Sequence, residues 1–272
     1  MPPLGQPHYL RPYPLNPDPL PLPYLHPTLQ DLDASCNPAL RLAPGLLPRL
    51  TALCTLHLSW TNAHVDLNDL LPPALTLTLA PAPATVPPPG PSPLSSSPCT
   101  CSSLTALHLA GCEMTQLPTG LWRLVGSLRS LDLSMNRLSS LPPQASSLTR
   151  LTYLDLSSNQ LRVLPLHLCT HLSALRRLSL RSNQFVQLPE GVDQLCCLEH
   201  LDMSVNRLQH LPDSLSALTT LTCLIIACNP MLGQLPPCFR SLTSLRQLDA
   251  RCTGLTEALR QLGTGPHTTI LT

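Results

Sequence analysis

Leucines recur at fixed intervals through most of the chain, and polar residues alternate with them in the same order each time. The stretches LRSLDLSMNRLSSLP, LTYLDLSSNQLRVLP and LEHLDMSVNRLQHLP share the pattern Leu-x-x-Leu-x-Leu-x-x-Asn-x-Leu, with Met203 in place of the third leucine in the last of them. With the first leucine as position 1, seven units follow one another at intervals of 23 or 24 residues. They begin at Leu104, Leu128, Leu151, Leu175, Leu198, Leu221 and Leu245.

The start of each unit has the alternation of a strand with one buried face. Positions 4 and 6 are apolar, whereas positions 3, 5 and 7 are mostly polar. One such unit cannot bury its leucines alone, but stacked neighbours form a continuous core. The pattern therefore predicts an α/β solenoid, a curved horseshoe with parallel strands on the concave face. Its convex face would carry the returns, as 3₁₀ turns, short helices or extended segments.

A single asparagine interrupts the leucines at position 9 of five consecutive units. The chain leaves the strand there, and its buried backbone groups need partners. A side-chain amide offers both donors and an acceptor, so we predict a structural ladder without a role in ligand binding. The ladder comprises Asn136, Asn159, Asn183, Asn206 and Asn229, and Cys112 and Thr253 fill the same position at its two ends.

Weaker repeats precede the seven regular units. Units starting at Leu29 and Leu53 fit the template, and ALTLTL at residues 74–79 supplies the strand of one more unit before Leu104. We therefore predict a proline-rich tail at 1–28 and a repeat domain at 29–272. Within that domain we expect degenerate units at 29–103, a mobile Pro/Ser-rich insertion at 80–98, regular units at 104–267, an outer helix at 256–265 and a short final strand in HTTILT.

The motifs NRLSSLP, NQLRVLP, NQFVQLP and NRLQHLP carry a family resemblance. They resemble the leucine-rich-repeat family, and within it the intracellular Ras-group scaffolds with a 23-residue period. The resemblance implies a cytoplasmic scaffold or adaptor in signal transduction, whose concave face binds a partner protein such as a small GTPase or another signalling protein. We also expect a monomer.

Charge and composition exclude several other roles. The formal net charge is +1 and 11% of residues are charged, so no basic surface for nucleic acid is expected. The proline-interrupted start lacks the basic region of a signal peptide, and no long apolar run predicts membrane insertion. We therefore expect the twelve cysteines to be free thiols in a reducing compartment, including Cys228 and Cys252 at position 8 of adjacent units.

The side chains at positions 3, 5 and 7 would form three columns on the concave face. In the position-3 column, Tyr153, Arg177 and His200 fall on three neighbouring strands, and tyrosine and arginine are common in binding hot spots. We predict a protein-binding site from Tyr153, Arg177, His200, Arg181, Asp155 and Asp202. An ordinary solvated face is the alternative, and the aspartates fit it best.

Two chemical readings compete with protein binding. Asp155, Ser179 and His200 are the residue types of a nucleophilic triad, but an open sheet offers no oxyanion hole or closed pocket, so no enzyme is predicted. Cys99, Cys101, His108 and Cys112 are zinc-ligand types, but the repeat register separates them, so neither a metal nor another cofactor is predicted. A ligand- or pathogen-sensing recognition module of receptor or innate-immune type remains the alternative function.

Overall fold

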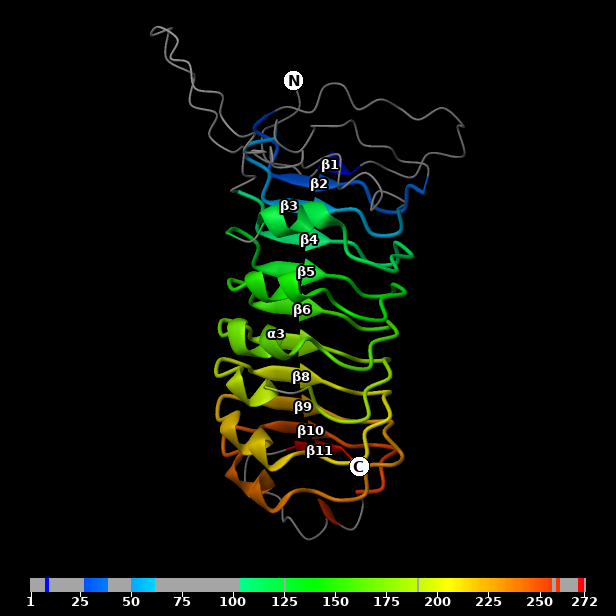
Figure 1. Ribbon diagram of the computed structural model, residues 1–272, viewed down its shortest axis with the longest axis vertical. Helices are drawn as coiled ribbons and strands as arrows, with labels where there is room; N and C mark the ends of the chain where they lie inside the picture. Colours follow the sequence, from blue (N-terminus) through cyan, green and yellow to red (C-terminus); the bar gives the residue numbers. More distant parts are fainter. Residues whose placement is uncertain are drawn as a thin grey trace, which may run out of the picture.

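Short strands stack in chain order to form one parallel sheet (Figure 1). The computed structural model describes residues 8–9, 27–38, 50–61, 103–124, 126–189, 191–255, 258–259 and 269–271. Within these residues, the sheet runs in the order β1 to β11. The strands are β1 (His8–Tyr9), β2 (Asp31–Asp33), β3 (Thr55–His57), β4 (Ala106–His108), β5 (Ser130–Asp132), β6 (Tyr153–Asp155), β7 (Arg177–Ser179), β8 (His200–Asp202), β9 (Cys223–Ile225), β10 (Gln247–Asp249) and β11 (Thr269–Leu271).

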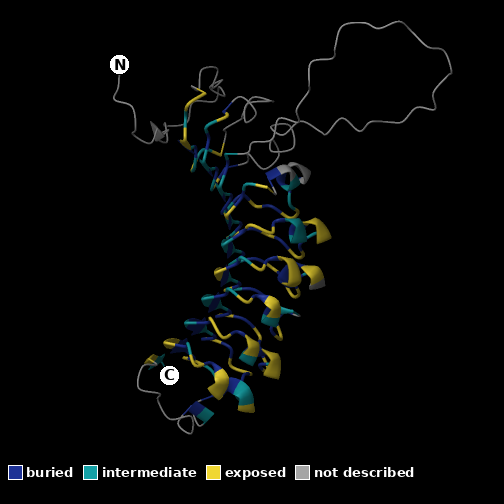
Figure 2. Ribbon diagram, turned by 90° about the vertical axis from the view of Figure 1, so that its left-hand side faces the viewer, coloured by how far each residue is buried: buried dark blue, intermediate teal, exposed yellow. Residues whose placement is uncertain are grey.

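The returns on the other side of the stack contain short helices, most of them 3₁₀ helices. Figure 2 shows the stack bending, with the strands on its inner side and the helical turns outside. This arrangement confirms the predicted leucine-rich solenoid. The helices are η1 (Thr119–Leu124), η2 (Pro143–Ser147), α3 (Leu166–His171), η3 (Val192–Gln194), η4 (Asp213–Ala217) and η5 (Pro237–Ser241).

The leucines of successive units lie directly above one another. Leu131 pairs in register with Leu154, which pairs with Leu178, and all three side chains are buried. Position 6 adds a second buried row, including Leu156. Fully burying one leucine contributes about 1.5–3 kcal/mol, so the stacked rows are the main source of stability.

Each unit leaves the sheet through one residue with left-handed backbone. This residue occupies position 8, and its amide donates to the position-7 carbonyl of the next unit, as from Ser158 to Arg181 at 2.8 Å. The turn extends the ladder of hydrogen bonds beyond the three-residue strands. The left-handed residues at position 8 are Cys36, Trp60, Gly111, Met135, Ser158, Ser182, Val205, Cys228 and Cys252, with φ between 53° and 66°.

The asparagine at position 9 joins two units through its side chain. The Nδ2 group of Asn159 donates to the carbonyls of Leu133 in the preceding unit and Leu156 in its own unit, both at 3.0 Å. Its Oδ1 accepts the amide of Leu138 at 3.0 Å. Asn136, Asn183, Asn206 and Asn229 repeat these contacts at equivalent positions. One side-chain type therefore satisfies the turn backbone of five successive units.

Shorter side chains occupy position 9 in the units next to the two ends of this ladder. The hydroxyl of Thr61 donates to the Leu58 carbonyl at 2.6 Å, and that of Thr253 donates to Ala250 at 2.6 Å. The buried thiol of Cys112 reaches the same Leu58 carbonyl at 3.1 Å. The end units thus retain part of the hydrogen bonding with fewer contacts.

The N-terminal part of the sheet corrects one prediction. β3 pairs directly with β4, with Leu56 in register with Leu107. The predicted unit at 74–79 therefore inserts no strand between them, and residues 74–79 and the predicted insertion at 80–98 lie outside the described residues. An apolar alternation shows that a segment can form a strand, but it does not show which strand is its neighbour.

Both ends of the sheet involve strands close to the chain termini. His8 of the predicted tail pairs with Leu32, so β1 extends the sheet by one strand. At the other end β11 pairs with β10, which confirms the final strand expected in HTTILT. Ala258 and Leu259 are helical, and the rest of the predicted helix at 256–265 lies outside the described residues.

We expect Asn159→Ala to lower the free energy of unfolding by about 1–3 kcal/mol, because it leaves buried carbonyls and one amide without partners. Chemical denaturation with circular dichroism measures the loss. Gln160→Ala, at the exposed neighbouring residue, is the control and should change stability by less than about 0.5 kcal/mol. Equal stability of the two variants would contradict the structural role of the ladder.

Candidate functional site

The concave face brings three of the predicted site residues into one row. Tyr153 on β6 pairs in register with Arg177 on β7, which pairs with His200 on β8. The side chain of Arg177 is exposed, and those of Tyr153 and His200 are partly exposed. Asp155 and Asp202 lie two residues further along their strands, on the same face.

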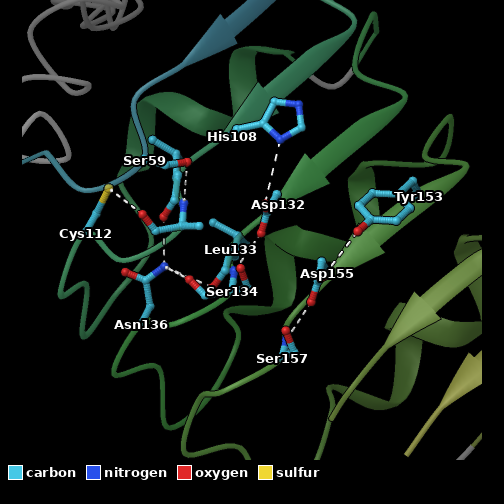
Figure 3. Close-up of polar contacts among 12 residues, drawn as sticks. Ser59, His108, Cys112, Asp132, Leu133, Ser134, Asn136, Tyr153, Asp155 and Ser157 are labelled. Atoms are coloured by element: carbon cyan, nitrogen blue, oxygen red, sulfur yellow. Dashed lines mark hydrogen bonds and ion pairs between the residues drawn. The ribbon is translucent and has the colours of Figure 1, made fainter. Parts of the chain in front are cut away.

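Tyr153 is held by a neighbour on its own strand. Its hydroxyl donates to Oδ2 of Asp155 at 3.1 Å (Figure 3). Partial burial, followed by the negative charge and the hydrogen bond of Asp155, raises the pKa of Tyr153 to about 12. Tyr153 therefore presents a neutral, oriented phenol to the concave face.

The position-5 aspartates support the turn that follows each strand. One carboxylate oxygen accepts the amide of the position-7 residue two residues later, as between Asp155 and Ser157 at 2.8 Å (Figure 3). This contact explains the recurring LDLS sequence as local structure, and it engages one oxygen of both predicted site aspartates. The same contact is made by Asp33, Asp132, Asp202 and Asp249.

The cationic side chains of the site differ in how they are held. Arg181 donates to the hydroxyl of Ser204 at 3.0 Å, and this hydroxyl donates to Asp202 at 2.6 Å. Arg177 and His200, in contrast, have no side-chain hydrogen bond or ion pair to any other described residue. These two residues are therefore the most available for a partner.

A histidine pair at the N-terminal half of the face was not predicted. The rings of His57 and His108 stack with centroids 4.2 Å apart and an interplanar angle of 7°. Burial, then the neighbouring His108, lowers the pKa of His57. The pair escaped prediction because a further unit was expected between β3 and β4. The clue was that both residues occupy position 5.

Asp132 extends this pair to the next strand. Nδ1 of His108 lies 3.7 Å from Oδ2 of Asp132 (Figure 3). Burial alone would raise the pKa of Asp132, but hydrogen bonds from His108 and from Ser134 outweigh it, and the pKa is lowered. The carboxylate is therefore charged over the physiological pH range.

The triad residue types do not assemble into a catalytic arrangement. Ser179 lies in register between Asp155 and Asp202, whereas His200 lies in register with Arg177 in another column. Ser179 makes no side-chain hydrogen bond to His200 among the contacts of the described chain. The register therefore does not pair Ser179 with His200 as a nucleophile and its base.

The two potential zinc ligands that lie within the described residues, His108 and Cys112, are separated from each other. His108 faces Asp132 on the concave side, while the thiol of Cys112 is buried and directed at a backbone carbonyl. Cys99 and Cys101 lie outside the described residues. Across the described ranges, no three His, Cys, Asp or Glu residues gather in a metal-binding group.

The position-8 turn residues form a second exposed surface along one edge of the sheet. We call this column of nine residues, Cys36 to Cys252, the position-8 ridge. Large apolar side chains on it include Trp60, 52% exposed, and Met135, 53% exposed. Trp60 lies over Gly111, where an added Cβ would come within 2.6 Å of the indole. Only a residue without a side chain leaves room for the ring in this position.

Sequence comparison identifies the repeats. Residues 159–264 match the family described as leucine-rich repeat region, and residues 102–161 and 126–185 match the family described as leucine rich repeat. The chain belongs to the leucine-rich-repeat proteins. No curated protein matches this leucine-rich-repeat chain in sequence.

Solved structures share the fold of this leucine-rich-repeat protein. A leucine-rich-repeat protein from Leptospira interrogans is 26% identical, with a TM-score of 0.70 over 90% of this chain and 55% of its own. The functional domain of InlJ from Listeria monocytogenes, which includes a cysteine ladder, is 21% identical, with a TM-score of 0.56 over 89% of this chain and 46% of its own. A TDR receptor is 28% identical, with a TM-score of 0.50 over 57% of this chain and 27% of its own.

The leucine-rich-repeat chain thus spans about half the length of the first two structures that it matches. Its repeats have the architecture of a protein-interaction module. No helix in the described ranges has both the length and the apolar content needed to cross a membrane.

We expect Asp155→Asn to lower the pKa of Tyr153 from about 12 towards its ordinary value, because the substitution removes the negative charge beside the phenol. In the wild-type protein, the folded state holds the proton of the Tyr153 phenol more tightly than the unfolded chain does. Tyr153 therefore contributes stability below pH ~10 that is lost as the pH rises towards 12.

Ultraviolet-difference or ¹³C NMR titration measures the pKa, and Tyr153→Phe identifies the signal. Asp202→Asn is the matched control, since Asp202 is not among the groups that shift the pKa of Tyr153. A Tyr153 midpoint that stays unchanged in Asp155→Asn would disprove this assignment.

Proposed function

We propose that this protein is an intracellular scaffold or adaptor that binds a partner protein on its concave face. The binding surface is centred on Arg177 and His200, and Tyr153, Arg181, Asp155 and Asp202 surround them. The motifs NRLSSLP and NRLQHLP, which resemble Ras-group scaffolds, make a small GTPase or another signalling protein the expected class of partner.

The observation that carries this proposal is that some side chains of the site are hydrogen-bonded within the protein and others are not. Tyr153 is fixed by Asp155, and Arg181 is fixed by Ser204. Arg177 lies between them on an exposed strand position without a hydrogen-bonding partner in the described chain, and His200 follows on the next strand. Side chains that are already fixed by hydrogen bonds lose less conformational entropy on binding. Polar groups without a partner can form the new contacts.

The charges favour an acidic segment of the partner. Arg177 and Arg181 are exposed cationic side chains, whereas Asp155 and Asp202 already accept hydrogen bonds from their own turns. Arginine forms bidentate contacts with carboxylate or phosphate groups. A partner that fills the inner face would bury about 1,200–2,000 Å², the usual area of a specific complex.

Several observations support the cellular setting. Ten cysteines in the described ranges are free thiols, which fits a reducing compartment and a cytoplasmic location. The net charge of +1 fits a protein partner better than nucleic acid. We propose that the protein acts as a monomer.

A ligand-sensing recognition module is the second candidate. The similarity to a TDR receptor and the coverage of only 27% of that receptor chain favour it. The stacked His57 and His108 would then offer a recognition surface separate from the arginines. Binding of a small molecule or carbohydrate to the concave face, without a protein partner, would support this candidate.

We expect the double variant Arg177→Glu, His200→Ala to reduce affinity for a concave-face partner by at least about 100-fold, because both hot-spot side chains are replaced and one charge is reversed. The partner is first captured from lysate on the wild-type protein. Its affinity for each purified variant is then measured by titration calorimetry.

Arg207→Glu is the matched control. Arg207 is exposed at position 10, beyond the asparagine ladder, and the substitution makes the same charge change away from the concave face. An equal loss of affinity in the double variant and the control would mean that only the change in net charge matters, and it would contradict the proposed surface. Unchanged binding of both would move the site to another face.

A further inference from the structure

Two exposed thiols lie at the same place in neighbouring repeats near the C-terminal end. Cys228 and Cys252 both occupy the position-8 ridge, with φ of 56° and 55°. The amide of Cys228 donates to the carbonyl of Arg251 at 2.8 Å, which keeps the two turns in register. No other adjacent turns of the ridge both carry a thiol.

The repeat spacing decides what these thiols can do together. Two turn residues with the same backbone conformation at equivalent places of stacked parallel repeats are related by a shift close to the strand spacing of about 4.8 Å, and so are their Cβ atoms. A disulfide needs Cβ atoms about 3.5–4.5 Å apart, so the turns would have to move together. Two metal–thiolate bonds of about 2.3 Å in line, in contrast, hold two sulfur atoms about 4.6 Å apart. This distance matches the shift between the two side chains, so the turns need not move.

A fixed cation directly precedes Cys252 in the chain. Nε and an amino group of Arg251 donate to the two oxygens of Asp249, at 3.0 and 2.7 Å. The pKa of Arg251 is raised, mainly by the hydrogen bond to Asp249 and to a smaller extent by the charges of Cys252 and Cys228.

Ligand number and type select the ion. Zinc in structural sites takes four ligands, but the described chain brings no third His, Cys, Asp or Glu residue into a metal-binding group with this pair. Thiolate is a soft ligand and selects soft ions, of which Cu(I) is the biological example that accepts two ligands in line.

We propose that Cys228 and Cys252 form a two-thiolate site for Cu(I) that bridges two neighbouring repeats. The site lies on the position-8 ridge, so it is separate from the row of Tyr153, Arg177 and His200. It does not depend on the proposed scaffold function.

The test is a titration of the full chain with Cu(I) under anaerobic conditions. Cu(I) is supplied as its coloured bicinchoninate complex, and transfer to the protein is read from the loss of that colour. All proteins carry Cys99→Ser, Cys101→Ser, Cys196→Ser and Cys197→Ser, because the Cys-x-Cys pair and the adjacent thiols of Cys196 and Cys197 would also take up Cu(I). The parent should bind one equivalent tightly.

Cys228→Ser and Cys252→Ser should each weaken this binding by about 100-fold or more, because one thiolate loses the effective concentration of the second. Cys36→Ser is the matched control: Cys36 is an exposed thiol of the same ridge, but the next turn carries Trp60. Its affinity should equal that of the parent. Circular dichroism checks that all three exposed-site variants remain folded.

Two results would overturn the site. The first is Cu(I) binding by Cys228→Ser that equals the parent in stoichiometry and affinity. The second is quantitative formation of a Cys228–Cys252 disulfide in a glutathione buffer, detected by peptide mapping. That result would show that the turns approach closely enough for the pair to act as a redox dithiol.

Discussion

The buried turn at the end of each strand is the constraint on which this fold depends. Two residues after position 6 the chain must leave the sheet, and it carries carbonyl and amide groups that neighbouring repeats cover. A left-handed residue at position 8 and an asparagine at position 9, such as Ser158 and Asn159, satisfy those groups in register with the next unit. Only with this register do Leu131, Leu154 and Leu178 fall into one buried row.

The parts of the fold that the sequence could predict are those that repeat. Leucine and asparagine spacing sets the strand position in every regular unit, because each residue has the same neighbours in the next repeat. The neighbour of a strand is not encoded in this way. ALTLTL at 74–79 has the apolar alternation of a strand, yet in the described sheet β3 pairs directly with β4.

The candidate site was predictable to a similar extent. The register alone places Tyr153, Arg177 and His200 in one row. Which side chains remain available depends on contacts within a strand, such as that of Tyr153 with Asp155, and these need the actual rotamers. The stacked pair of His57 and His108 was missed for a different reason, because its two members are adjacent only if no repeat separates them.

The direct pairing of β3 with β4 also divides the array unequally. Most inter-repeat hydrogen bonds join residues about one repeat apart, 23 residues for Thr152 and Arg129, whereas Thr105 reaches Cys54 across 51 residues. Doubling a loop costs only about 0.6 kcal/mol of closure entropy, so the contact is thermodynamically inexpensive. In a linear array, however, each unit is held only by its neighbours. The junction between β3 and β4 thus has the same ladder of hydrogen bonds as the others, and it closes the longest stretch of chain of any junction in the described sheet.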